Sequence, residues 1–566
     1  MPRTDMPGTD APVMEHSANW PDGGADGPAG GAGRPGLLRR LASRRRRAFP
    51  WLLAPVSLVI VAVLLSPLAL IAIQAVQTGW GQLWPVLDRP FVATLLWNTV
   101  RLAVLVTALC AVIGTVAAWL TERTALPGRR VWSALLIVPL VIPDFVLSWA
   151  WSSVFPSVQG YFGAVLVMTL HLYPLVYLPM TAAFRAADPG QEEAARSLGL
   201  SRWAAWLRIS VRQARSVLLG GCLLVCLSLM AYYGAFENLH YQTFTTAIFG
   251  ELRTQFNPAG ASALSLVLVV LSVLVLGGET AFRERGRLQR PGAMAQRAQQ
   301  TIPLRAPTRL AALGGVVILV ALALGFPVAI VCYWMTIGGS STLPAAVSLG
   351  SAVGYTAGYS ALGALAATVL ALPVSLLAAR HQRRWTAALE RSTFITQAIP
   401  GVVIGLALVF LASRYLGFLY QSPQLLIASY TLMFFPLGLV AVTSSVLRAS
   451  PRLEEAGRSL GRGPWVVRLT VTLPLLAPGL AAAFCFVFLS AATELTATLL
   501  LVPTGVQTLA TQFWAYAEQG VSFGAAAPYA AAMIVISAVP AYLLGQWFDR
   551  RSGLEPGGTS VLEALS

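Results

Sequence analysis

The sequence predicts an all-helical integral membrane protein, with about twelve transmembrane helices arranged as two parallel repeats of six. Its composition, its long apolar runs and the recurrence of short motifs at a nearly fixed offset support this prediction. Of the 566 residues, 56% are hydrophobic and only 11% are charged, whereas soluble domains carry about 25% charged residues. The composition therefore excludes both an ordinary soluble enzyme and a disordered chain.

Apolar runs follow one another from Trp51 almost to the end of the chain. A helix needs about 20 apolar residues to cross a hydrocarbon core of roughly 30 Å, and most of these runs reach that length. The eleventh run is the shortest. The predicted spans are residues 51–76, 97–120, 131–154, 161–184, 216–234, 261–281, 310–337, 350–379, 392–413, 423–447, 476–492 and 523–548.

The basic residues predict the orientation of these spans. All 39 are arginines, and the 23 acidic residues leave a net charge of +16. With the amino-terminal tail in the cytoplasm, the cytoplasmic loops and the two termini hold 35 of the arginines. Cytoplasmic loops of membrane proteins carry such an excess of positive charge. We therefore expect a multi-pass protein of a bacterial inner membrane, surrounded by lipid, with both termini in the cytoplasm.

Several functions are excluded by what the chain lacks. Without any lysine, it has no phosphate-binding loop, so ATP would have to bind to another chain. The arginines form no basic face with interleaved aromatics, so we expect no nucleic-acid partner. The five cysteines and four histidines show no ligand spacing, and no nucleophile, base and orienting group recur. We therefore expect no metal site, no cofactor and no catalytic residue.

The chain divides into two halves at an arginine-rich segment. We predict a disordered basic cytoplasmic tail at 1–50, a first membrane half at 51–281, a cytoplasmic linker at 282–309, a second membrane half at 310–549 and a cytoplasmic tail at 550–566. Matching residues lie 257 or 262 positions apart in the two halves: Arg123 and Arg380, Pro143 and Pro400, Pro174 and Pro436. Because each half has six spans, the repeats are parallel and related by an axis along the membrane normal.

A second recurrence lies in the longest cytoplasmic loop of each half. The two copies are Glu193-Ala194-Ala195, ending at Gly199, and Glu455-Ala456-Gly457, ending at Gly461. Asp188-Pro189 and Ser450-Pro451 precede them, which is typical of a capped helix start with proline in the first turn. Glycine readily takes the left-handed conformation that ends a helix. Each loop is thus predicted to form a short helix, a tight turn and a second helical stretch.

These loops resemble the EAA loop of binding-protein-dependent ABC importer permeases, in which Glu-Ala-Ala is followed by Gly and then by Ile-x-Leu-Pro. The second copy continues with Val471 and Pro474, whereas the first continues with Ile209 and has Arg212 in place of the proline. The resemblance implies a MetI-like permease fold without enzymatic activity. It also implies that both loops couple the chain to an ATPase dimer, and that an extracytoplasmic binding protein delivers the substrate.

The transported substrate is suggested by a further resemblance. The run Glu494-Leu495-Thr496-Ala497-Thr498, with the later Gln507-Thr508-Leu509-Ala510-Thr511, is similar to loops of fused ferric-iron importer permeases. This similarity implies iron(III) transport. Thiamine, polyamine and phosphonate permeases of the same layout stay as alternatives. An ion-coupled secondary transporter, which would share the repeats, is an alternative of another class, and a membrane enzyme or scaffold has little support.

Carboxylates in the membrane are the candidates for the translocation path, because ionisable residues there are rare and usually functional. Glu494 and Glu237 lie at the outer ends of equivalent spans, and Asp144 lies near mid-membrane beside Pro143. The alternative is that Asp144 caps a helix broken by proline and that the two glutamates are solvated loop residues.

Overall fold

The computed structural model describes residues 53–187, 189–287, 303–338, 344, 346–381, 383–518 and 522–551. The predicted tail at 1–50, most of the linker at 282–309 and most of the carboxyl-terminal tail lie outside these residues. The described residues form helices and no strand. The predicted all-helical fold is confirmed.

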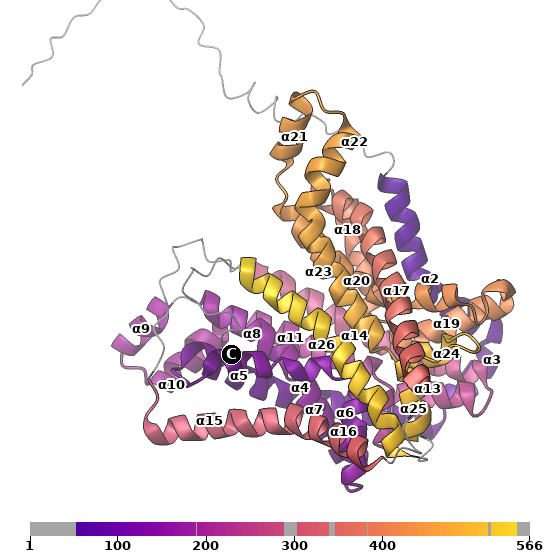
Figure 1. Cartoon of the computed structure of the whole chain (residues 1–566), viewed down its shortest axis with the longest axis horizontal. Helices are drawn as coiled ribbons and strands as arrows, with labels where there is room; N and C mark the ends of the chain where they lie inside the picture. The colour runs from indigo at the N-terminus through magenta and orange to yellow at the C-terminus, as the bar shows by residue number, and fades with distance from the viewer. Residues whose placement is uncertain are drawn as a thin grey trace, which may run out of the picture. The chain divides into compact units, whose positions relative to one another are not determined.

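The first half contains long helices that alternate with short ones (Figure 1). In chain order its elements are α2 (Leu53–Thr78), α3 (Trp80–Leu87), α4 (Pro90–Arg123), α5 (Arg129–Leu135), η1 (Val138–Val141), α6 (Asp144–Val154), α7 (Gly160–Leu172), α8 (Pro174–Ala186), α9 (Pro189–Ser197), α10 (Arg202–Ala205), η2 (Trp206–Val211), α11 (Arg215–Ala231), α12 (Gly234–Asn238), α13 (Phe244–Arg253) and α14 (Pro258–Arg287).

The second half repeats this order after the linker. Its elements are α15 (Ala306–Val320), η3 (Ala321–Gly325), α16 (Phe326–Ile337), α17 (Ala346–Arg380), α18 (Arg384–Thr393), η4 (Phe394–Ala398), α19 (Gly401–Arg414), η5 (Gly417–Leu419), α20 (Pro423–Arg448), α21 (Pro451–Ser459), α22 (Pro464–Val467), η6 (Arg468–Thr472), α23 (Leu473–Ala492), α24 (Thr496–Leu501), α25 (Leu509–Glu518) and α26 (Phe523–Arg551).

Nine helices among the described residues are long and apolar enough to cross a membrane, or up to eleven if two bent pairs each count as one span. The predicted fifth span corresponds to α11, an apolar helix that is shorter than the others. The predicted eleventh span, 476–492, extends back to Arg468 and is 25 residues long. Its first turns carry Thr470 and Thr472, which interrupt the apolar run that the prediction used.

Two predicted spans, 131–154 and 392–413, are not straight. Each is broken at the repeated proline, with bends of 91° at Pro143 and 98° at Pro400. A residue that precedes proline avoids the helical conformation, and Ile142 and Ile399 are accordingly extended, with ψ of 125° and 117°. Hydropathy counts apolar residues without regard to the backbone, so it could not detect these breaks.

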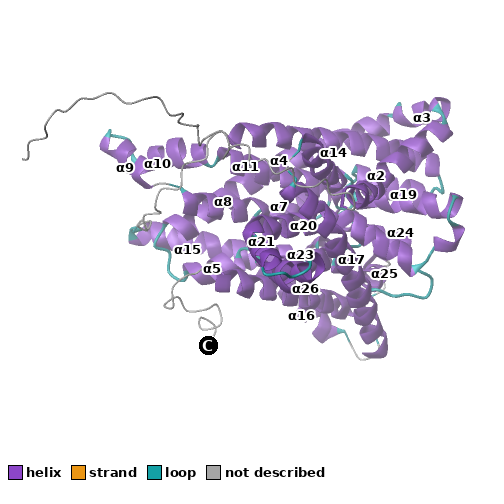
Figure 2. Cartoon of the chain, turned by 90° about the horizontal axis from the view of Figure 1, so that it is seen from above, coloured by secondary structure: helices purple, strands orange, loops and turns teal. Residues whose placement is uncertain are grey.

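The first membrane span of each half, which in the second half comprises α15, η3 and α16, packs on the other half. Helix α2 contacts α17 and α19, beside which it lies in Figures 1 and 2. Helix α16 contacts α6 in return, where Trp151 and Phe326 have ring centroids 4.2 Å apart and Trp334 donates a hydrogen bond to Ser153 at 3.2 Å. One continuous hydrophobic core therefore runs through both halves.

Candidate coupling helices and translocation path

Both loops of the Glu-Ala-Ala type form the predicted short helix, α9 in the first half and α21 in the second (Figure 1). Each ends at a glycine with positive φ, +92° at Gly199 and +79° at Gly461. The following amide bonds back to the carbonyl five residues earlier, from Leu200 to Ala195 at 3.2 Å and from Arg462 to Gly457 at 3.3 Å. This pattern satisfies the last carbonyls of a helix, so the turn predicted at these glycines is confirmed.

The predicted cap at the helix start is described for α21 but not for α9. In the second half, the Ser450 side chain accepts a hydrogen bond from the Arg452 amide at 3.4 Å, and Pro451 lies in the first turn. The predicted cap of the first copy, Asp188, lies outside the described residues.

The second helical stretch of each loop widens into a π-helical turn, η2 in the first half and η6 in the second. In the second half this turn leads directly into α23, which has Pro474 in its first turn. In the first half, where Arg212 replaces the proline, a turn at Ala214 separates the stretch from α11. The first copy thus departs from the Ile-x-Leu-Pro pattern close to the point where its helical connection to the next membrane helix is interrupted.

We call α9 and α21 the candidate coupling helices, and one side of each is exposed. In the first copy, Glu193 and Ala194 are exposed, as are Glu455 and Ala456 in the second. Leu198 and Leu460, just before the terminal glycines, are 87% and 80% exposed. Exposed leucines flanked by small residues leave room for close approach by another protein surface. We call these two sides the docking faces of α9 and α21.

The third residue of each motif faces inward instead. Ala195 and Gly457 are buried. A Cβ atom at Gly457 would lie 3.2 Å from a methyl group of Val467 and 3.8 Å from one of Val471. Val471 therefore supports the coupling helix from the second stretch, and Ile209 is half-buried in the first loop. Ala195 and Gly457 are buried and Ile209 and Val471 are half-buried, so none of the four belongs to the docking faces.

Two ion pairs, which the motif alone did not single out, attach the coupling helices to the membrane helices. Arg123 at the end of α4 pairs with Glu192 at 2.5 Å, and Arg380 at the end of α17 pairs with Glu454 at 2.7 Å. All four side chains are at most 16% exposed. The signal was present in the sequence, because the arginines recur at an offset of 257 and each acid directly precedes its motif glutamate.

We expect Gly461→Ala to loosen the second coupling helix, because an L-residue in the left-handed conformation costs about 1–2 kcal/mol. Hydrogen exchange of the amides in 455–467, measured on the purified transporter, should become faster. Gly463→Ala is the matched control, because a Cβ atom there has open space and no unfavourable φ. Equal exchange in the two variants would contradict this account of the turn.

Two of the three candidate path residues, one from each half, interact electrostatically. Asp144 is the first residue of α6, directly after the break at Pro143, and Glu494 lies two residues before the start of α24. Their carboxyl groups are close enough to interact electrostatically, and the Tyr232 side chain interacts with both. The Tyr232 hydroxyl also lies 3.3 Å from Nε2 of His171. Sequence reasoning assigned no role to this histidine.

The two carboxylates occupy pseudo-equivalent places, although they come from different elements. Asp144 Oδ2 accepts a hydrogen bond from the Ala235 amide at 3.3 Å, and Glu494 Oε1 accepts one from the Ala497 amide at 3.0 Å. Ala235 and Ala497 are 262 residues apart and are the second residues of the equivalent helices α12 and α24. In the second half Gly401 stands at the position of Asp144, and a Cβ atom there would lie 3.1 Å from Glu494 Oε1.

The structure describes the surroundings of the three acids. The helix is broken at Pro143, and the Asp144 carboxylate accepts a hydrogen bond from the Ala235 amide of α12. Glu494 and Glu237 are half-buried and not fully solvated. Glu237 interacts with Glu518 of α25. Among the described residues, no group of three or more histidines, cysteines and acids could hold a metal ion.

Comparison with known proteins identifies the family. The family described as binding-protein-dependent transport system inner membrane component matches residues 111–285 and 371–553, once in each half. The chain is 34% identical over 483 residues to the Fe(3+)-transport system permease protein FbpB 2 of Haemophilus influenzae, covering 85% of this chain and 95% of that one.

Two further relatives show how the halves relate to other permeases. The sulfate transport system permease protein CysT of Escherichia coli is 27% identical over 235 residues, which is 38% of this chain and 84% of that protein. The probable ABC transporter permease protein y4fN of Sinorhizobium fredii is 26% identical over 496 residues, covering 77% and 85%. One half of this chain thus corresponds to a whole permease of the first kind.

These matches confirm the predicted resemblance and the two repeats. They set aside the ion-coupled secondary transporter and the membrane enzyme, because the related proteins are transport subunits. With nine to eleven apolar spans among the residues that the structure describes, the protein is a multi-pass inner-membrane protein. The chain belongs to the family of binding-protein-dependent transport system inner membrane components and is the permease of an ABC importer.

Proposed function

We propose that this permease imports iron(III), that an extracytoplasmic binding protein delivers the substrate, and that a separate ATPase dimer drives transport through α9 and α21. One copy of the chain would serve each transporter, because its two docking faces match two ATPase subunits. The proposed orientation places both docking faces and both termini in the cytoplasm, where the arginine-rich loops belong.

The coupling proposal rests on the two docking faces. Each combines exposed small residues with an exposed leucine, and each is attached by a buried or half-buried ion pair to the end of a long membrane helix. A partner that moves the two faces would thus move α4 and α17. For ATP binding to drive the chain, the ATPase must bind the two conformations of the permease with different affinity.

The choice of iron rests on the extent of similarity. The Fe(3+)-transport relative matches 85% of this chain, across both halves, whereas the sulfate permease matches 38% at lower identity. The described residues contain no cluster of metal ligands, and iron transport needs none in this chain if the binding protein coordinates the ion until release. Sulfate is the second candidate substrate, because one half of this chain is similar to a sulfate permease.

Transport by the complete system tests the substrate directly. The chain, its ATPase and its binding protein would be reconstituted in vesicles and supplied with labelled iron(III) or labelled sulfate. We expect iron to accumulate only with ATP and sulfate to stay at the ATP-free background. Accumulation of sulfate without iron would contradict the proposal and favour the second candidate.

We expect Glu494→Gln to lower iron uptake at limiting substrate by about tenfold, the equivalent of about 1.4 kcal/mol. The amide oxygen of glutamine can still accept the hydrogen bond from Ala497, so the change removes the charge but keeps the cap. Glu237→Gln should lower uptake less, because Glu237 is not part of the Asp144–Glu494 pair and interacts instead with Glu518 on α25. Unchanged uptake in Glu494→Gln would leave this acid a purely structural role.

A further inference from the structure

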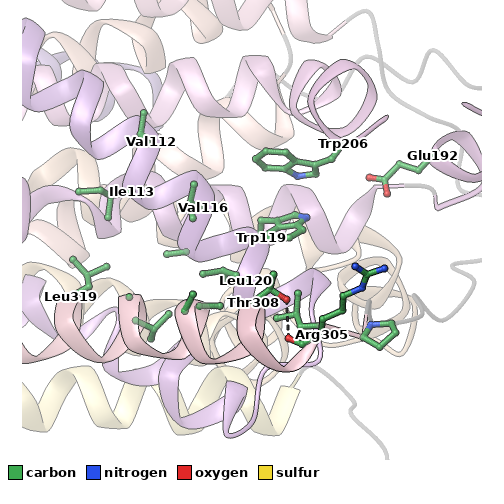
Figure 3. A pocket seen from close by; sticks show the side chains of 17 residues that line it. Val112, Ile113, Val116, Trp119, Leu120, Glu192, Trp206, Arg305, Thr308 and Leu319 are labelled. Carbon is green, nitrogen blue, oxygen red and sulfur yellow. Dashed lines mark hydrogen bonds between the residues drawn. The ribbon is translucent and has the colours of Figure 1, made fainter. Parts of the chain in front are cut away.

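A large groove lies between α4 of the first half and α15 of the second (Figure 3). Its volume is about 900 Å³, near the upper end of the roughly 300–1,000 Å³ typical of small-molecule sites. Its walls are mostly apolar, and the residues that line it include Val112, Val116 and Leu120 on α4, and Ala312, Gly315 and Leu319 on α15.

The sequence explains why this space is hollow. On α15 the lining residues recur every three or four positions, so they form one face of the helix. This face carries Ala311, Ala312 and Gly315, whose side chains are too small to fill the gap to α4. Across the groove, Val112 and Val116 are 62% and 42% exposed, so the groove is open along α4.

One end of the groove is polar and lies at a membrane boundary. Arg305 lines it and directly precedes the apolar span Ala306–Ile337. Trp119 and Trp206, with ring centroids 5.5 Å apart, line the same end, and tryptophan is enriched at membrane interfaces. Among the described residues that line the groove, the one acid is Glu192, whose charge is balanced by Arg123 at 2.5 Å. The uncompensated charge at this end is therefore positive.

We propose that this groove binds a phospholipid with an anionic headgroup. The apolar walls belong to membrane spans and therefore suit acyl chains. If the groove were empty, its walls would lose dispersion contacts, and water in it would find few polar partners. Arg305 and the first amides of α15 attract the headgroup. The linker residues 288–302 are a poorer occupant of the groove, because they are rich in arginine and glutamine and contain no long apolar run.

The position of this lipid has a functional consequence. It would contact α4 of one half, α15 of the other, and both Glu192 of α9 and Trp206 of the following stretch. The lipid would thus fill the space between the halves at the base of the first coupling helix. The proposal is independent of the identity of the transported substrate.

Photoactivatable lipids test the site in the full chain. Vesicles of phosphatidylcholine would contain a small fraction of photoactivatable phosphatidylglycerol or, in parallel, photoactivatable phosphatidylcholine, and labelled peptides would be mapped by mass spectrometry. We expect phosphatidylglycerol to label the segments 112–120 and 308–319 above the rest of the membrane surface. Labelling spread evenly over all apolar helices, or equal labelling of these segments by both lipids, would overturn the proposal.

Matched variants on α15 separate the groove from the surrounding bilayer. Gly315→Trp fills the groove and should abolish labelling of 112–120, whereas Gly314→Trp, at a neighbouring glycine outside the lining, should leave it unchanged. Arg305→Glu should lower labelling by phosphatidylglycerol about fivefold, and Arg309→Glu, outside the lining, much less. Unchanged labelling in Gly315→Trp, or a cysteine cross-link from position 315 to the linker, would contradict a lipid occupant.

Discussion

Replacing Leu198 and Leu460 together by aspartate should abolish both the copurification of the ATPase and substrate uptake. These side chains are 87% and 80% exposed on the docking faces, so their replacement places two charges where a partner surface must exclude water. Burying an unpaired charge is costly enough to prevent association. Because surface substitutions usually change stability by at most about 0.5 kcal/mol, the permease itself should stay folded.

The matched control keeps the apolar volume. Leu198→Met with Leu460→Met should retain the ATPase and most of the uptake, because volume-conserving apolar exchanges are tolerated. Each single aspartate variant should weaken copurification without abolishing it, since one docking face remains. Full copurification and uptake in the double aspartate variant would contradict the assignment of these faces.

Arg123→Met should uncouple ATP hydrolysis from transport without releasing the ATPase. Removing one partner of a buried ion pair costs about 3–5 kcal/mol, and Arg123 is only 6% exposed beside Glu192. The docking face of α9 is untouched, but the helix loses its attachment to α4. We expect uptake to fall much further than ATP hydrolysis, and Arg380→Met to do the same in the second half.

A nearby ion pair whose arginine is exposed provides the control. Arg185 pairs with Glu122 at 2.5 Å and is 67% exposed, against 13% for Glu122, so solvent screens the charge of this arginine far more than that of Arg123. Arg185→Met should therefore leave coupling nearly unchanged. Exchanging the partners, as Arg380→Glu with Glu454→Arg, should restore part of the uptake lost in Arg380→Met. Equal losses in Arg185→Met and Arg123→Met would show that the buried pairs have no special role in coupling.

Local features of the coupling loops could be predicted from the sequence because their physics is local. A capping residue with proline starts a helix, and glycine ends it, whatever lies around them. Gly199 and Gly461 therefore adopt the predicted conformation. The sequence also identified the two halves, since a repeat is visible without any knowledge of contacts.

Features that depend on contacts across the chain could not be predicted. The inward orientation of Gly457 requires knowing that Val467 packs against it. The proximity of Asp144 and Glu494 was hidden because the acid stands on different elements in the two halves, so the two acids do not align in the sequence repeat. Tyr232 stands at the place of Glu494, and Gly401 at that of Asp144.

Site-specific cross-linking tests the central claim most directly, namely that two coupling helices transmit force from an ATPase dimer to the membrane. Single cysteines at positions 198 and 460, in a chain whose five native cysteines are replaced, would be cross-linked to the ATPase with and without ATP. The account predicts a cross-link to an ATPase subunit from each position, with a yield that changes on ATP binding. It would be contradicted if either cysteine reacted with a membrane-impermeant reagent added outside intact cells, or if neither reached the ATPase in any nucleotide state.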